Sequence, residues 1–153
     1  MQVYRISKHK YSEDLSGTGA GIGGGRWNLK DFKVVYTSSS RALATLEVLV
    51  HISAGIMPAS MALTVLYIPD DSISFLDEAL LKEGWDSIVQ ADYLKSIGTA
   101  WLMQGKTLTF RAPSAVVKGE YNFLLNPAHS RMKEVKILTM DSYKFDERLF
   151  IKN

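Results

Sequence analysis

Arg26 is the first residue of the sequence whose surroundings suggest chemistry. It directly follows Gly23, Gly24 and Gly25, at the end of a glycine-rich stretch. A glycine backbone lets a ligand approach closely, and the planar guanidinium of arginine can hold a diphosphate through two parallel charge-assisted hydrogen bonds. A single arginine is more often a solvated surface residue, so the pattern alone leaves both interpretations open.

Glu47 is the second candidate, because it stands beside an apolar pattern with helical spacing. The apolar positions are Ala42, Leu43, Leu46, Leu49 and Val50. A carboxylate at the edge of such a face is held in partly dry surroundings, where its charge acts strongly. The alternative is a glutamate whose side chain extends into solvent.

Three further polar residues follow predicted strands or lie in them. Tyr36 ends a short strand and could stack on a ring or bond a sugar, or pack at the edge of the core. Ser114 lacks the flanking glycines of a nucleophile elbow, which favours a hydrogen-bonding role over a nucleophilic one. Asn122 is either a ligand contact or an ordinary residue of a turn or sheet edge.

The glycine-rich stretch contains a formal GxGxxG match from Gly19 to Gly24. A dinucleotide-binding fingerprint requires a buried strand before the glycines and a helix after them. Residues 10–14 (KYSED) do not form a buried strand, and residues 26–28 open no helix. We therefore interpret 7–28 as a long functional connection and not as part of a Rossmann fold.

Composition excludes several classes of function. The 18 basic and 16 acidic residues are scattered, with a net charge of +2, so no basic patch predicts direct nucleic-acid binding. The absence of cysteine excludes disulfides, thiolate metal sites and thiol catalysis. His9, His51 and His129 lack the spacing of a metal site, so we expect none. No signal peptide and no stretch near ~18 apolar residues is found, which predicts no membrane association and a cytoplasmic location.

The predicted elements position these residues within one domain spanning residues 1–153. Strands and helices are mixed without regular alternation, which favours an α+β fold with mixed or antiparallel sheets and flanking helices. Serines 38–40 offer caps for a helix that runs to about Ile52. Further helices are predicted weakly at 76–82 and more clearly at 90–103. Strands are predicted at 3–6, 34–36, 61–68, 108–111, 115–117, 121–125 and 135–138.

The order and spacing of several short motifs resemble the RES domain, a family named for its arginine, glutamate and serine. The matching motifs include Tyr4-Arg5, Gly24-Gly25-Arg26-Trp27-Asn28, Val35-Tyr36-Thr37-Ser38, Glu47 with His51, Pro113-Ser114-Ala115, and Asn122 with Leu125-Asn126-Pro127. Two departures lie in connections: residues 117–120 lack an expected proline, and residues 128–130 replace a usual His-Pro. These departures concern the shape of loops more than the chemistry.

The resemblance implies a fold related to the ADP-ribosyltransferases, with NAD as the substrate and no separate cofactor. It assigns catalysis to Arg26, Glu47 and Ser114, and it assigns NAD binding to Tyr4, Arg5, Arg26, Tyr36, Ser114 and Asn122. In this interpretation Glu47 stabilises positive charge on the ribose, and Arg26 with Arg5 holds the diphosphate. Tyr36 packs on the nicotinamide riboside, and Ser114 bonds the amide or the diphosphate.

The resemblance also implies a biological role, the toxin of a bacterial type II toxin–antitoxin system that depletes NAD by cleaving its nicotinamide–ribose bond. The implied partner is an Xre-type helix-turn-helix antitoxin that covers the active site, with homodimers inside the complex. Water, inorganic phosphate or a protein side chain could accept the ADP-ribose. The alternatives are a protein ADP-ribosyltransferase and a non-catalytic NAD-binding module.

Overall fold

A single mixed sheet organises the part of the chain that the structure describes. The computed structural model describes residues 1–52, 56–89 and 92–150. Within these ranges seven strands are hydrogen-bonded in the order β4-β5-β6-β2-β1-β3-β7, with β4 and β5 parallel and the other pairs antiparallel. The strands are β1 (Gln2–Lys8), β2 (Val35–Ser38), β3 (Met61–Tyr67), β4 (Ile73–Phe75), β5 (Thr109–Pro113), β6 (Tyr121–Leu125) and β7 (Lys136–Tyr143). The predicted α+β class is confirmed.

Helices in the described ranges are few and short. They are α1 (Thr18–Gly23), α2 (Arg41–Leu49) and α3 (Asp92–Gln104), together with the 3-10 turns η1 (His9–Tyr11), η2 (Glu78–Leu80), η3 (Ser130–Glu134) and η4 (Glu147–Leu149). Ser40 caps α2, since its hydroxyl accepts a hydrogen bond from the backbone N–H of Leu43 at 3.0 Å. Of the three predicted cap residues Ser40 is thus confirmed, although α2 ends at Leu49 and not near Ile52. Positions 90 and 91 of the predicted helix 90–103 lie outside the described residues.

Three predictions of secondary structure are wrong. Residues 76–82 form only the turn η2, and the connection 7–28 contains η1 and α1. Residues 115–117 form a bend and no strand, because the N–H groups of Val116 and Val117 bond the Ser114 hydroxyl at 3.0 and 3.1 Å. Such local side-chain bonds compete with strand pairing.

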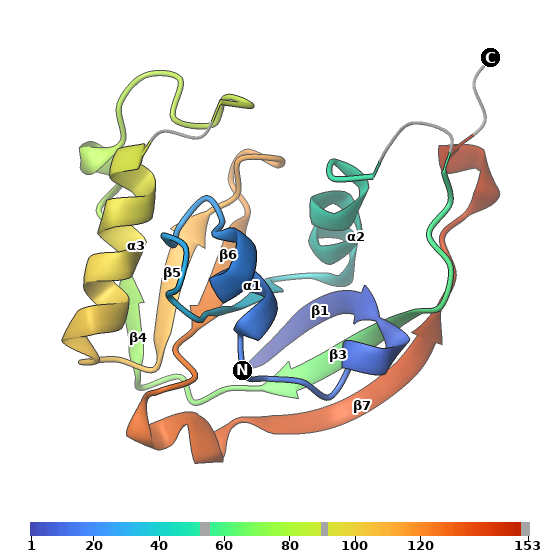
Figure 1. Ribbon diagram of the computed structural model, residues 1–153, viewed down its shortest axis with the longest axis horizontal. Coiled ribbons are helices and arrows are strands. Elements are labelled where there is room, and N and C mark those ends of the chain that lie inside the picture. Colours follow the sequence, from blue (N-terminus) through green and yellow to red (C-terminus); the bar gives the residue numbers. More distant parts are fainter. Residues whose placement is uncertain (53–55, 90–91, 151–153) are drawn as a thin grey trace.

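Two of the helices pack on the same face of the sheet. Leu94 and Trp101 of α3 pack on Phe110 of β5, and Ala44 of α2 packs on Leu63 of β3. The strand registers place these two packing surfaces on one side. Figure 1 shows α3 at one end, α2 nearer the other, and α1 between them. Helices α2 and α3 therefore cover separate parts of the same face of the sheet.

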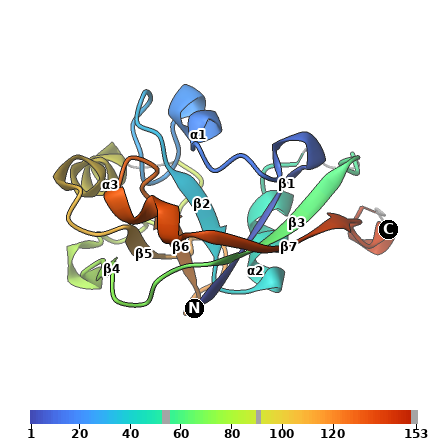
Figure 2. The same cartoon turned by 90° about the horizontal axis from the view of Figure 1, so that it is seen from below.

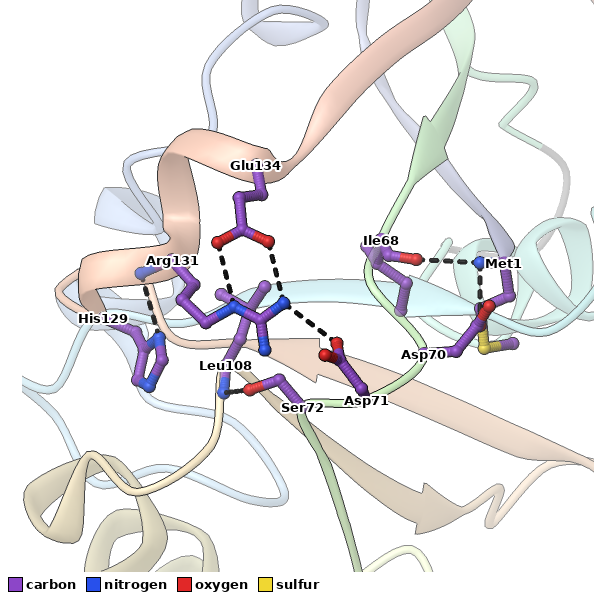
Figure 3. Close-up of polar contacts among 9 residues, drawn as sticks. All are labelled: Met1, Ile68, Asp70, Asp71, Ser72, Leu108, His129, Arg131 and Glu134. Carbon is purple, nitrogen blue, oxygen red and sulfur yellow. Dashed lines mark hydrogen bonds and ion pairs between the residues drawn. The ribbon is translucent and has the colours of Figure 1, made fainter.

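The opposite face is closed by the segment that leads into β7. Met132 and Val135 pack there on a cluster of buried residues that includes Phe123 and Leu125. Arg131, in the same segment, bonds Glu134 and also reaches Asp71, as Figure 3 shows. This ion-pair cluster joins two segments that are 60 positions apart in the sequence.

The sheet opens between β1 and β2. Within the described residues these two strands share one register pair, Tyr4 with Ser38. Figure 2 shows that β1 and β2 lie close together near one end and diverge from there. Because the strands separate instead of pairing along their length, side chains and backbone from both can line a cavity at this place. In the described residues, no helix has the length and apolar character needed to cross a membrane.

Candidate functional site

A cavity of about 480 Å³ occupies the opening between β1 and β2 and extends beneath α1 and α2. Six of the residues predicted from the sequence line it: Tyr4, Arg5, Arg26, Tyr36, Glu47 and Asn122. Ser114, the seventh, is buried directly behind Glu47 and bonds it. The structure therefore places all seven candidate residues in or against one cavity, although they come from three strands, one helix and two connections.

Arg26 lies in a tight turn that Asn28 and Tyr36 hold together. The Asn28 amide donates to the backbone carbonyls of Ala20 and Phe32, each at 2.9 Å. The Tyr36 hydroxyl donates to Oδ1 of Asn28 at 2.7 Å and accepts from the N–H of Trp27 at 3.1 Å. The turn before Arg26 is thus fixed by buried polar contacts rather than left as a flexible glycine loop.

Gly25 is required for this turn. A Cβ atom at Gly25 would lie 2.6 Å from the Tyr36 hydroxyl and 2.8 Å from Oδ1 of Asn28. Both distances are too short for a side-chain carbon, so only glycine allows Tyr36 and Asn28 to meet beneath Arg26. Among the glycines of the stretch, Gly25 therefore contributes directly to the position of the candidate arginine.

The surroundings of Tyr36 define how it can contact a ligand. Burial raises the pKa of its hydroxyl well above the ordinary value, and Arg26 and Glu47 both lie close enough to influence it. The hydroxyl is already bonded to Trp27 and Asn28, so the ring is the part of Tyr36 that remains for a ligand.

Helix α3 supports the same turn from outside. A Cβ atom at Gly98 would lie 1.9 Å from the carbonyl oxygen of Trp27, so the helix and the turn are in direct backbone contact. The next residue, Thr99, accepts a hydrogen bond from the N–H of Leu29 at 3.0 Å. Helix α3 therefore supports the turn around Arg26, which we call the arginine turn.

The Arg26 guanidinium is held by the connection between η2 and α3. It donates to the carbonyl oxygens of Trp85 at 2.8 Å and Ser87 at 3.0 Å. The Trp85 ring packs on Trp27, with centroids 6.1 Å apart. A guanidinium has five N–H donors, so these two bonds fix its plane and leave other donors for an anion.

Glu47 has one carboxylate oxygen fixed by the protein. Its Oε1 accepts hydrogen bonds from the Ser114 hydroxyl at 2.8 Å and from the side-chain amide of Asn122. Within the described residues Oε2 accepts no hydrogen bond from the protein. Glu47 therefore presents one free carboxylate oxygen on a cavity that Arg26 also lines.

The Ser114 hydroxyl has no capacity left for a ligand. It donates to Glu47 and accepts from the N–H groups of Val116 and Val117, and a hydroxyl offers one donor and two acceptor positions. The expected direct bond from Ser114 to the substrate amide or diphosphate does not fit this arrangement. The geometry instead makes Ser114 a positioning residue for Glu47.

Arg5 closes the cavity on the side of β1. Its guanidinium donates to the carbonyl oxygens of Tyr11 and Asp14, at 3.0 and 3.1 Å. Burial lowers the pKa of the Arg5 guanidinium, and the nearby carboxylate of Asp14 opposes that change. Arg5 therefore both holds the η1 segment and brings positive charge to the cavity wall.

Sequence reasoning missed the residues that hold the candidates in place. Trp85 and Ser87 act through backbone carbonyls, which leave no signal in the sequence. The sequence predicted Ser38 as a possible helix cap, but its hydroxyl donates a hydrogen bond to Asn122 at 2.8 Å. The Val35-Tyr36-Thr37-Ser38 motif could have indicated a role for Ser38 in the site, because the same motif contains the candidate Tyr36.

Comparison with known proteins gives a consistent result. The family model of the RES domain matches residues 2–146. A Prs ADP-ribosylating toxin of Sphingobium sp. is 37% identical over 144 residues, which is 92% of this chain and 89% of that protein. Toxin Res of Photorhabdus laumondii is 36% identical, covering 97% of each chain. A chain in the crystal structure of the M. tuberculosis MbcT-MbcA toxin-antitoxin complex shares the fold, with a TM-score of 0.75 and 19% identity over 94% of this chain and 84% of that chain.

Proposed function

This chain belongs to the RES domain family, and from this premise we propose that it is the toxin of a type II toxin–antitoxin pair that cleaves the nicotinamide–ribose bond of NAD. The observation that carries the proposal is Glu47, with one oxygen fixed by Ser114 and Asn122 and the other free on a cavity lined by Arg26. Relatives named Toxin Res and Prs ADP-ribosylating toxin support the toxin class.

The proposed reaction needs an anion more than an acid. When the bond between the ribose C1 and the nicotinamide nitrogen breaks, its electron pair passes to the ring nitrogen and nicotinamide leaves as a neutral molecule. Positive charge then develops on the ribose, as in glycoside hydrolysis. The free Oε2 of Glu47 stabilises this charge, directly or through a ribose hydroxyl, and preorganised groups of this kind contribute a large part of catalysis. A new bond forms from an acceptor oxygen to the ribose C1. Water as the acceptor then loses one proton to the solvent, whereas an ionised phosphate oxygen forms the bond without losing a proton.

The other residues of the cavity bind and orient the dinucleotide in this proposal. Arg26 holds the diphosphate with the N–H groups that Trp85 and Ser87 leave available, and Arg5 adds positive charge. The Tyr36 ring packs on the nicotinamide riboside, while Tyr4 and Asn122 complete the wall. NAD is the substrate, so the mechanism uses no additional cofactor.

The test is an assay of purified protein with NAD that measures released nicotinamide and identifies the second product. ADP-ribose indicates water as the acceptor, and ADP-ribose phosphate formed only with added phosphate indicates phosphorolysis. Glu47→Gln should lose about a hundredfold or more in rate while remaining folded. A folded Glu47→Gln variant that cleaves NAD at the wild-type rate would refute the proposal.

A second candidate function is protein ADP-ribosylation, which the name of the Sphingobium relative favours. In that case NAD labelled in the adenosine would label a protein, and nicotinamide release would depend on an added protein acceptor. Binding of NAD without consumption would instead identify a non-catalytic module.

The proposal includes an antitoxin that covers the cavity. Exposed apolar side chains stand beside it: Ile22 on α1 is 68% exposed, and Val50, which lines the cavity after α2, is 56% exposed. Such side chains next to a polar site suit a protein partner. We propose an Xre-type helix-turn-helix antitoxin, acting on a toxin homodimer in the cytoplasm, and its addition should stop nicotinamide release.

A further inference from the structure

Ser38 connects the middle of the sheet to the candidate catalytic carboxylate. It is the last residue of β2, it is 4% exposed, and it is a register partner of both Tyr4 on β1 and Asn122 on β6. Its hydroxyl donates to Oδ1 of Asn122 at 2.8 Å. Ser38 therefore occupies the point from which β1 and β2 diverge to form the cavity.

The Ser38 bond holds the end of the Asn122 amide that faces away from Glu47. A carboxamide has a carbonyl oxygen at one end and an NH₂ group of nearly the same shape at the other. With Oδ1 bonded to Ser38, the NH₂ group points to Oε1 of Glu47 and donates to it. The reversed orientation would place a carbonyl oxygen against a carboxylate, which repels it.

The orientation of the amide in turn sets the rotamer of Glu47. Oε1 is held on one side by Ser114 and on the other by Asn122, so the carboxylate cannot rotate without losing both bonds. Ser114 is itself fixed by two backbone N–H groups, whereas Asn122 has only its neighbour Ser38 at the far end of its amide within the described residues. Loss of Ser38 therefore frees one of the two supports of Glu47.

We propose that Ser38 is a positioning residue for NAD cleavage, which acts through Asn122 to keep Oε2 of Glu47 directed at the ribose. This inference rests on the proposed function for its kinetic consequence, but the bond network does not depend on it. Ser38 also lines the cavity, but its hydroxyl hydrogen is donated to Asn122, so the role proposed for it is positioning and not substrate contact. Its removal should lower kcat and leave the KM for NAD nearly unchanged, because the diphosphate contacts of Arg26 remain.

The test compares Ser38→Ala with Ser72→Ala. Ser72 is a matched control: it is 5% exposed, and its hydroxyl accepts one hydrogen bond, from the N–H of Leu108 (Figure 3), on the opposite side of β5 from the Glu47 network. We expect Ser38→Ala to lower kcat about tenfold, which corresponds to one well-placed hydrogen bond, and Ser72→Ala to leave kcat unchanged. Urea unfolding of both variants reports any general loss of stability.

A double-mutant cycle separates positioning through Asn122 from a general effect on the fold. In an Asn122→Ala background the Ser38→Ala change should have no further effect on kcat, because its only route to Glu47 is gone. An equal fall in kcat in both backgrounds, a fall no larger than in Ser72→Ala, or an effect confined to KM would each overturn the inference.

A measurement without turnover distinguishes failure of this inference from failure of the proposed function. The side-chain amide protons of Asn122 should exchange slowly with solvent in the wild type and faster in Ser38→Ala, as followed by NMR. Faster exchange in a protein that does not cleave NAD would retain the positioning and reject the function. Unchanged exchange in an enzyme that cleaves NAD would reject the positioning and retain the function.

Discussion

The Tyr36 hydroxyl forms hydrogen bonds with Trp27 and Asn28. Tyr36 is therefore a structural support as well as a residue that lines the cavity. Tyr36→Phe removes the hydroxyl, so the N–H of Trp27 loses its hydrogen-bond acceptor and Oδ1 of Asn28 loses its donor. Unpaired buried groups cost about 1–3 kcal/mol each in stability. We therefore expect a lower free energy of unfolding in urea and a raised KM for NAD, since Arg26 is in the same turn.

Tyr121→Phe is the control for this prediction. The Tyr121 hydroxyl donates to Glu78 at 3.1 Å on the surface, and exposed substitutions of this kind usually change stability by less than about 0.5 kcal/mol. If the two variants unfold at the same urea concentration, the hydroxyl of Tyr36 does not hold the arginine turn.

Arg26 acts through the shape of its side chain as well as its charge. Arg26→Lys keeps the charge but cannot bond the carbonyls of Trp85 and Ser87 in one plane and still offer a fork to a diphosphate. Hydrogen bonds to charged groups are worth about 1.5–3 kcal/mol, so we expect the KM for NAD to rise by about tenfold or more. Arg111→Lys is the control, because Arg111 stacks between Phe75 and Tyr121 and does not line the cavity. An unchanged KM in Arg26→Lys would contradict the diphosphate role.

At the scale of the elements, helix α3 determines where the arginine turn lies. Gly98→Ala would put a Cβ atom 1.9 Å from the carbonyl oxygen of Trp27, so the helix or the turn must move. Overpacking of this kind costs about 1–3 kcal/mol or more. We expect a lower free energy of unfolding together with a loss of NAD turnover.

Gly23→Ala is the matched change for this prediction. Gly23 is also helical, and a Cβ atom there meets nothing within 4 Å. Alanine is favoured over glycine in helices by up to about 1 kcal/mol, so this variant should be as stable as the wild type or more so. If both variants are equally stable, α3 does not support the turn.

The sequence predicted the position of helix α2 but only part of its buried face. The Ser40 cap and the helix after it followed from residue types, but the predicted apolar face was partly wrong: Leu46 is 40% exposed, while Leu43 and Ala44 are buried. Apolar residues are common on protein surfaces, so hydropathy alone does not fix which side of a short helix faces the core. The rotation that results places Glu47 toward the cavity.

The elements that were missed share a physical cause. Helix α1 is six residues long, and five of them are apolar or glycine without an amphipathic pattern. Strand β4 has only three residues. Both form because neighbouring elements fix them, and periodicity carries no signal at that length. The carbonyls that hold Arg26 are likewise invisible in a sequence, whereas the identities of Arg26, Glu47 and Asn122 were available from the family motifs.

At the scale of the whole molecule, the cavity exists because the sheet is interrupted. The pairing of β1 with β2 stops after Tyr4 and Ser38, and the residues of both strands that would otherwise pair line the cavity instead. Such an opening must be held by contacts outside the sheet. The segment before β7 provides one, since Arg131 bonds Glu134 and joins it to Asp71, which lies between β3 and β4 (Figure 3).

The Arg131 cluster predicts how the stability of the fold depends on pH. Hydrogen bonds from Arg131 hold the pKa of Asp71 and of Glu134 below their ordinary values. Groups with a lowered pKa in the folded state stabilise the protein above their unfolded pKa of about 4, and this stabilisation disappears as the pH falls through the lowered values. Removing Arg131 should therefore matter most at neutral pH.

We expect Arg131→Gln to lower the free energy of unfolding at pH 7, and the difference from the wild type to shrink as the pH is lowered below about 4. Urea unfolding at a series of pH values measures this difference directly. The cluster is exposed, so added salt should reduce it as well. Lys106→Gln, which removes one positive charge from an exposed position after α3, should give a difference that is small at every pH. A difference for Arg131→Gln that stays constant from pH 7 to pH 3 would mean that Asp71 and Glu134 do not depend on Arg131, and that the far side of the fold is held by apolar packing alone.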